Sequence, residues 1–243
     1  GGISDRALVK LLATVREQPE IVTDSTSRQD IQRTHDEAWE SVGQIDDLEL
    51  TEGGTFKWYH SRPSAVLNYF LARCPVFSTL FQSRLRASPC TPTSPWSIVL
   101  YADEVTPGAA LKPVNERKSW AWYFTFLQFG SENIAREELW LPFGILRSGI
   151  TKTVKGGVSA VARCVVRSFF GTSGASACDD FCDNGVVLAP EGQQTLFFAR
   201  VTNLLADDEA LTRIYDVRGA SSLLPCLECK NVVPDATDVS GQE

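Results

Sequence analysis

Residues 88–95 contain three prolines, and the spacing of apolar residues changes across this segment. Because a residue before proline is disfavoured in the helical conformation, the segment predicts a rigid connector and a domain boundary. Before it, apolar residues recur at helical intervals; after it, they form the short runs and alternations typical of strands. We therefore expect a helical N-terminal region over 1–94, an α/β domain over 95–224 and a short C-terminal unit over 225–243.

The elements on each side of the connector follow from these patterns. In the N-terminal region we expect helices over 3–12, 25–42 and 63–85, the last broken at Pro75, with residues 43–62 polar and turn-rich. The first two helices could form a DNA-binding helix-turn-helix, but packing against the core is the simpler interpretation. After Pro95 we expect strands over 96–102, 119–129, 139–147 and 195–205, and helices over 131–138, 150–170 and 209–217.

The predicted first and fourth strands of the α/β domain both end on acidic residues. Asp103-Glu104 follows the apolar run 96–102, and Asp207-Asp208 follows 195–205. Strand, strand, strand, helix, strand, helix is the opening order of an RNase H-like mixed sheet, in which the first and fourth strands are neighbours. The fold class that we predict is therefore α/β, RNase H-like, with Asp103 and Asp207 converging.

Convergent carboxylates suit two-metal phosphodiester chemistry, in which two divalent ions lie about 3.5–4 Å apart. We predict Asp103 and Asp207 as catalytic residues and as ligands of Mg²⁺ or Mn²⁺. Their neighbours Glu104 and Asp208 would point to the opposite face of a strand. The alternative for Asp207 and Asp208 is helix N-capping, which aspartate often performs.

Three segments together resemble a known arrangement: Leu100-Tyr101-Ala102-Asp103-Glu104, Leu205-Ala206-Asp207-Asp208-Glu209-Ala210-Leu211, and Pro225-Cys226-Leu227-Glu228-Cys229 after Gly219. They are similar to the core of the Plavaka-type and Kyakuja–Dileera–Zisupton DDE transposases of eukaryotes, over roughly residues 96–233. The resemblance implies metal-dependent DNA cleavage and strand transfer by Asp103, Asp207 and a third acid from a helix beyond the cysteine pair. Such a helix does not follow in this chain, so the resemblance implies an incomplete core, active or inactive.

Seven cysteines and two histidines supply the other metal-ligand candidates. Cys226 and Cys229 have the spacing of half a structural Zn²⁺ site. The remaining ligands could be Cys178 and Cys182 or lie outside the sequence, and plain reduced thiols are the alternative. For Cys74, Cys90 and Cys164 we expect packing roles, and neither His35 nor His60 belongs to a pattern typical of nucleophilic catalysis.

Charge and hydropathy restrict the partners. The net charge of −7 argues against an extended basic surface, so DNA contacts are expected only from the local cluster Lys112, Arg117 and Lys118. A solvated charged turn is the alternative there. No apolar run approaches the roughly 20 residues of a membrane span, and no signal segment opens the chain. We expect an intracellular, nuclear protein, and the absence of methionine indicates an internal part of a longer product.

Three functions remain open after these observations. The first is a transposase-derived nuclease acting on DNA. The second is a module of the same fold that binds nucleic acid or protein without catalysis. The third is a purely structural α/β domain with incidental aspartates.

Overall fold

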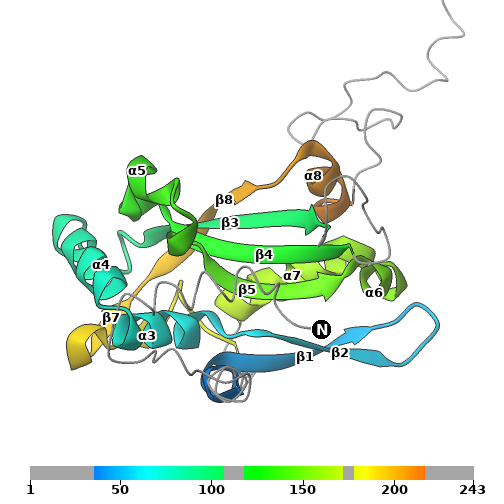
Figure 1. The fold of residues 1–243 in the computed structure, drawn as a ribbon, viewed down its shortest axis with the longest axis horizontal. Helices are drawn as coiled ribbons and strands as arrows, with labels where there is room; N and C mark the ends of the chain where they lie inside the picture. The colour runs from blue at the N-terminus through cyan, green and yellow to red at the C-terminus, as the bar shows by residue number, and fades with distance from the viewer. Residues whose placement is uncertain (1–35, 107–117, 172–177, 217–243) are drawn as a thin grey trace, which may run out of the picture.

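A six-stranded mixed sheet forms the centre of the molecule (Figure 1). The computed structural model describes residues 36–106, 118–171 and 178–216. The strand order is β1-β2-β5-β4-β3-β8, where β3 and β8 are parallel and the other neighbours are antiparallel. The strands are β1 (Gly43–Glu49), β2 (Thr55–Ser61), β3 (Trp96–Val105), β4 (Ser119–Phe126), β5 (Leu141–Arg147) and β8 (Ala199–Leu205). The predicted α/β class is confirmed.

Helices connect and cover these strands. They are α3 (Pro63–Arg73), α4 (Pro75–Ala87), α5 (Ser131–Ile134), α6 (Ser148–Thr153), α7 (Gly157–Phe169) and α8 (Asp208–Ile214). Three 3₁₀ turns, at Leu127–Phe129, Glu137–Leu139 and Pro190–Gly192, and a small hairpin of β6 (Val186–Leu188) with β7 (Thr195–Phe197) complete the order. Proline at the first position starts both α3 and α4, where its missing N–H costs no helical hydrogen bond.

Several predicted elements after residue 95 are divided in the structure; the helix expected over 131–138, for example, becomes α5 and the 3₁₀ turn Glu137–Leu139. The expected helix over 150–170 breaks between α6 and α7, because Gly156 and Gly157 adopt positive φ angles of 86° and 56° that interrupt a right-handed helix. The expected strand over 195–205 becomes β7 and β8, which belong to different sheets. Only β8 therefore reaches the main sheet.

The predicted helical N-terminal region over 1–94, with a polar and turn-rich stretch at 43–62, contains two strands that were not expected. These strands form the β1–β2 hairpin, which extends the main sheet through the pairing of His60 with Gly144. Alternation explains the strands: Gln44 and Leu48 point inward from β1, and Trp58 and His60 point inward from β2. Aromatic residues in β2 favour this pleated, half-buried environment.

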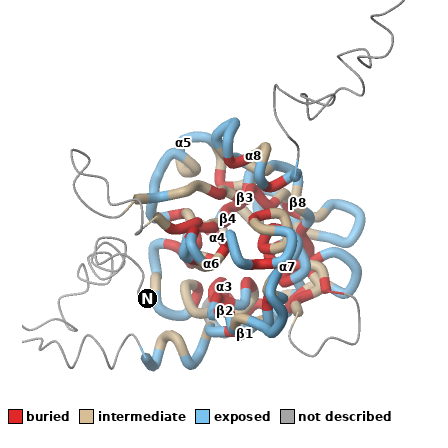
Figure 2. The backbone as a smooth tube through the Cα atoms, turned by 90° about the vertical axis from the view of Figure 1, so that its right-hand side faces the viewer, coloured by how far each residue is buried: buried red, intermediate tan, exposed pale blue. Residues whose placement is uncertain are grey.

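The core lies on one face of the sheet, between the strands and the helices α3, α4, α7 and α8. In Figure 1 α7 lies behind β4 and β5, and Figure 2 shows the buried residues concentrated along β3, β4 and the inner side of α7. The ring of Phe124 on β4 packs at 5.1 Å from that of Phe169 on α7. Alternation along β3 therefore directs Ile98, Leu100 and Ala102 toward this core.

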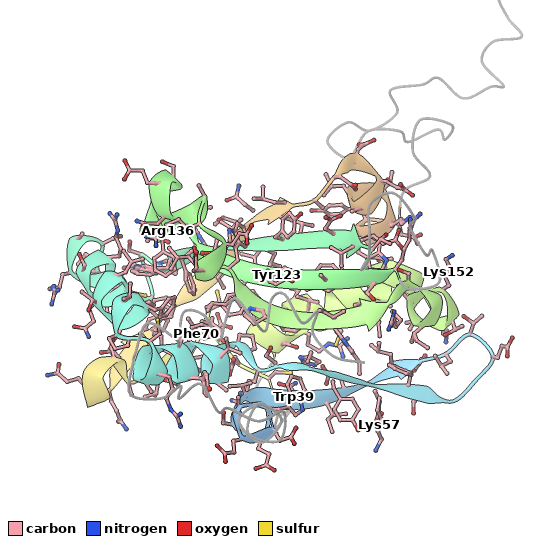
Figure 3. The ribbon with its side chains drawn as sticks, in the orientation of Figure 1. Trp39, Lys57, Phe70, Tyr123, Arg136 and Lys152 are labelled. Atoms are coloured by element: carbon pink, nitrogen blue, oxygen red, sulfur yellow. The ribbon has the colours of Figure 1, made fainter. Side chains whose placement is uncertain are left out.

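The other face of β3 and β4 carries Tyr101, Asp103 and Tyr123. Tyr123, labelled in Figure 3, stands opposite Tyr101 in the antiparallel register of β3 with β4. All three side chains are half-buried, whereas Leu100, Ala102, Trp122 and Phe124 on the inward face are buried. Asp103 therefore stands on the less covered face of a strand whose opposite face is embedded in the core.

Candidate functional site

Asp103 and Asp207 each lie two residues after the last pair of residues that joins the neighbouring parallel strands β3 and β8. The last paired residues of β3 and β8 are Tyr101 and Leu205, and each aspartate comes two residues later. Adjacent strands of a sheet lie about 4.8 Å apart. The expectation that these two strands are neighbours is confirmed, and the catalytic role of the aspartates stays a prediction.

The hydroxyl of Tyr101 lies beside the Asp103 carboxylate. It donates a hydrogen bond to Asp103 Oδ2 at 3.1 Å. Burial raises the pKa of Tyr101, and the negative charges of Asp103 and Asp207 raise it further. The rings of Trp140 and Tyr123 pack around the Tyr101 ring, with centroids 5.8 and 6.4 Å away. Both carboxylates therefore act on one hydroxyl in an aromatic corner of the sheet.

Asp207 is also the N-cap of α8. Its Oδ1 accepts a hydrogen bond of 2.6 Å from the backbone N–H of Ala210, and its backbone is extended. The capping alternative for Asp207 is thereby confirmed. A carboxylate offers about four lone-pair sites on two oxygens, so one capping bond does not use up its capacity to bind a cation.

The cap gives a testable difference between two substitutions of Asp207. We expect Asp207→Ala to lower the free energy of unfolding by about 1 kcal/mol, because the α8 amide loses its acceptor. Asp207→Asn should leave that energy nearly unchanged, since asparagine caps helices as well as aspartate does. Urea denaturation followed by circular dichroism measures both. Equal destabilisation by the two substitutions would contradict the cap and point to a role for the charge.

Glu104, the neighbour of Asp103, faces the helix-covered side of the sheet. Lys118 Nζ lies 3.3 Å and Arg213 Nη1 3.8 Å from its carboxylate. Burial opposes its ionisation, but the nearby Ser148 hydroxyl and the two cations more than offset this, so the pKa of Glu104 is lowered. Lys118, predicted to contact DNA, is thus paired with Glu104. Lys112 and Arg117 lie outside the described residues.

Among the described residues, no third acid, histidine or cysteine completes a compact ligand group with Asp103 and Asp207. One such group occurs elsewhere in the described ranges. It consists of Asp46 on β1, His60 on β2 and Cys164 on α7, whose ligand atoms all lie within 4.8 Å of one another. Cys226 and Cys229, the predicted zinc ligands, lie outside the described residues.

Asp46 is the central member of this group. Its Oδ2 lies 2.8 Å from His60 Nε2 and accepts the thiol hydrogen of Cys164 at 3.0 Å. Hydrogen bonding to His60 lowers the pKa of Asp46 although burial opposes this, and Cys164 adds to the effect. His60 is fully buried, and its ring stacks at 4.8 Å on Phe143. The group therefore lies at the edge of the core, where His60 and Cys164 are buried and Asp46 is partly exposed.

The order of the three groups does not suit nucleophilic catalysis. A cysteine nucleophile needs a histidine as its immediate base, whereas here the carboxylate stands between the thiol and the imidazole. Burial and the adjacent Asp46 charge raise the pKa of Cys164 well above its ordinary value. The thiol therefore stays protonated near neutral pH, and the chemistry that these donors can perform is hydrogen bonding or metal coordination.

No protein-family model matches this chain, and the comparison with curated proteins finds no match either.

No helix in the described ranges is long and apolar enough to cross a membrane.

Sequence reasoning missed the Asp46, His60 and Cys164 group because its members are far apart in the chain. Cys164 was expected only to pack, and it is indeed buried, at 7% exposure. The sequence did indicate which side chains point inward. His60 lies on the same side of its strand as the buried Trp58, and Cys164 lies on the same side of its helix as the buried Val161 and Val165. Such a pattern identifies donors that point into the core, but it does not show which donors from different elements contact one another.

Proposed function

We propose that this chain is a transposase-derived domain with an RNase H-like core, in which Asp103 and Asp207 bind Mg²⁺ or Mn²⁺ for cleavage of DNA phosphodiesters. The observation that supports the proposal is the parallel pairing of β3 with β8. Asp103, near the end of β3, and Asp207, just beyond β8, each follow the last residue pair of these strands by two residues. The order of elements from β3 to α8 also fits the opening of an RNase H-like fold.

The chain's own residues would contribute position and charge to such a site. β3 is hydrogen-bonded on both sides, by β4 and β8, so Asp103 would be held with little freedom. The Tyr101 hydroxyl orients one oxygen of Asp103 through its hydrogen bond. A bound pair of divalent ions would supply the nucleophile activation and the charge neutralisation that this chemistry requires.

A second candidate function is a module of the same fold that binds DNA or protein without cleaving it. Two observations favour it. The described residues supply no third ligand beside the aspartates, and Asp207 has a structural task as the α8 cap. A domain that kept its sheet and lost its third acid would retain both features.

The experiment that tests the proposal is nicking of supercoiled plasmid by the full chain in Mn²⁺. We expect Asp103→Asn to lower the nicking rate roughly 100-fold or more, the order of loss when a main stabiliser of transition-state charge is removed. Asp207→Asn, which preserves the cap, should do the same. Asp47→Asn, an exposed aspartate of β1, is the matched control and should cleave normally.

The outcomes separate the candidates. Nicking that persists in Asp103→Asn would overturn the catalytic assignment. If the wild-type chain does not nick but binds DNA, the non-catalytic module is favoured. Loss of Mn²⁺ binding in Asp103→Asn, followed through the electron paramagnetic resonance signal of the free ion, would support the metal site even in a chain that does not cleave.

A further inference from the structure

We propose that Asp46, His60 and Cys164 bind a transition-metal ion, most suitably Zn²⁺, with Cys178 as the fourth donor. This site is separate from the strand-end aspartates. It lies between the β1–β2 hairpin and α7, and strands β5 and β4 separate β2 from β3 in the sheet. The inference does not depend on the proposed DNA chemistry.

The donor atoms are already close to the spacing that a zinc ion requires. Asp46 Oδ2 lies 2.8 Å from His60 Nε2 and 3.0 Å from Cys164 Sγ. Zinc bonds of about 2.0–2.3 Å in a tetrahedral arrangement would hold such atoms roughly 3.4–3.7 Å apart. For these two pairs, insertion of the ion therefore needs the atoms to separate by about half an ångström. The third pair, His60 Nε2 and Cys164 Sγ, lies within 4.8 Å. One nitrogen, one oxygen and one sulfur are donors that zinc accepts readily.

The surroundings of His60 are suited to a metal ion at its Nε2 atom. Its Nδ1 lies 3.1 Å from the carbonyl oxygen of Ser61, and its Nε2 faces the Asp46 carboxylate. Both neighbours are acceptors, so only a charged imidazolium could donate to both. A neutral ring that donates from Nδ1 to the carbonyl and binds a metal through Nε2 also satisfies both nitrogens. That arrangement is the usual support of a histidine ligand, and it avoids a buried imidazolium.

Cys178 lies within electrostatic reach of the same donors. Its pKa is raised by burial and then by the Asp46 charge, and Cys164 in turn responds to Cys178. The segment is tied to the end of α7, because the N–H of Asp179 donates to the carbonyl of Ser168 at 3.0 Å. Cys178 also packs directly against Gly171, where an added Cβ would lie 2.9 Å from the thiol sulfur. Cys178 lies outside the compact group of three donors, so it would have to move toward the ion to act as the fourth donor.

Two neighbours fit a metal site better than a bare hydrogen-bonded group. Both amide atoms of the Gln44 side chain are buried, and Gln44, which pairs with His60 across the hairpin, helps to lower the pKa of Asp46. A ligand carboxylate that turns toward a metal could accept from this amide. The Arg167 cation partly opposes the rise in the pKa values of Cys164 and Cys178 that burial and Asp46 cause. This cation would offset the net negative charge of two thiolates and a carboxylate around one Zn²⁺.

The first test measures zinc in the purified full chain after dialysis against a zinc-free buffer. We expect about one zinc ion per chain to depend on this site. Cys164→Ser should abolish that zinc. Cys90→Ser is the matched control, since Cys90 is a half-buried thiol whose hydrogen bonds are to backbone atoms, among them those of Phe198. The double substitution Cys226→Ser/Cys229→Ser separates the C-terminal cysteine pair.

Each result of this test decides the proposal. Zinc that survives Cys226→Ser/Cys229→Ser and Cys90→Ser but not Cys164→Ser supports it. Zinc that is lost only with Cys226→Ser/Cys229→Ser overturns it, because the ion then belongs to the C-terminal pair. Absence of zinc from the wild-type chain, even after addition of Zn²⁺, also overturns it.

A second measurement guards against a Cys164→Ser variant that fails to fold. Co²⁺ is added to the Cys226→Ser/Cys229→Ser chain, in which the core donors are intact. We expect a thiolate-to-cobalt charge-transfer band and the intense visible bands of a tetrahedral ion. If neither appears, no core thiolate binds metal and the proposal fails. Adding Cys178→Ser should weaken the charge-transfer band; an unchanged band would remove Cys178 from the site.

Discussion

Replacement of Trp96 by alanine will lower the free energy of unfolding by about 3–5 kcal/mol, the range for truncating a buried tryptophan. Trp96 is 1% exposed at the start of β3. Its indole N–H donates to the carbonyl of Ser88 at 2.8 Å. Its ring packs against four phenylalanine rings with centroids between 5.1 and 6.0 Å away: Phe81, Phe126, Phe129 and Phe197.

The size of this effect follows from how many elements meet at one ring. The four phenylalanines come from α4, β4, the 3₁₀ turn Leu127–Phe129 and β7, so no single element can close the cavity by moving. Urea denaturation followed by circular dichroism gives the change. Tyr59→Ala, which removes a 53% exposed aromatic ring from β2, is the control and should change stability by less than about 1 kcal/mol. A similarly small loss for Trp96→Ala would show that this cluster does not anchor β3.

The sequence was most informative where apolar patterns are long and local. The run 96–102 predicts β3 because a strand buried on its inward face tolerates no polar residue there, and Pro75 predicts the break between α3 and α4 because proline cannot continue a helix. The neighbouring placement of β3 and β8 was also anticipated from the order of elements. These features depend on information within a few residues or on general rules of connection.

The β1–β2 hairpin was not anticipated because its pattern is weak in isolation. Residues 43–49 include two adjacent aspartates, Asp46 and Asp47, and only one of them points inward. Within the strand, Asp46 contacts His60 and Cys164 from other elements. A polar residue on the inward side of a strand obscures the alternating pattern by which a strand is predicted. The partners that accommodate Asp46 lie 14 and 118 residues away in the sequence.

The same limit applies to the candidate sites. Asp103 could be singled out from sequence because a buried strand ends on it, and its neighbour Asp207 because a similar strand does. The sequence around Asp207, however, could not show whether this residue caps a helix or binds a catalytic metal, since both roles fit an aspartate just before a helix. The structure places a hydrogen bond on one of its oxygens and thereby identifies Asp207→Asn as the substitution that separates the two uses.

Replacement of Asp179 by alanine will lower the free energy of unfolding by about 3 kcal/mol, the low end of the range for breaking a buried ion pair. Asp179 is 2% exposed and joins the segment after α7 to the start of α3. Its Oδ1 accepts from Arg62 Nε at 2.9 Å and from the Ser64 hydroxyl at 2.6 Å, and its Oδ2 accepts from the Ser64 N–H at 2.7 Å. The cost stays near the low end because the Arg62 side chain is 44% exposed and water can solvate it.

Asp179→Asn should be nearly as destabilising as Asp179→Ala. This result would show that the site requires two acceptor oxygens and not merely a side chain of the size of aspartate. Both carboxylate oxygens accept hydrogen bonds here, whereas an asparagine amide must turn its NH₂ group toward one of the donors. The control is Asp47→Ala, an exposed aspartate that should change stability by about 0.5 kcal/mol or less. Full tolerance of Asp179→Asn would mean that one acceptor suffices to hold α3.

The connection matters for the proposed metal site as well, because Asp179 adjoins Cys178. Loosening this anchor should weaken Co²⁺ binding by the fourth donor, while the charge-transfer band from Cys164 persists.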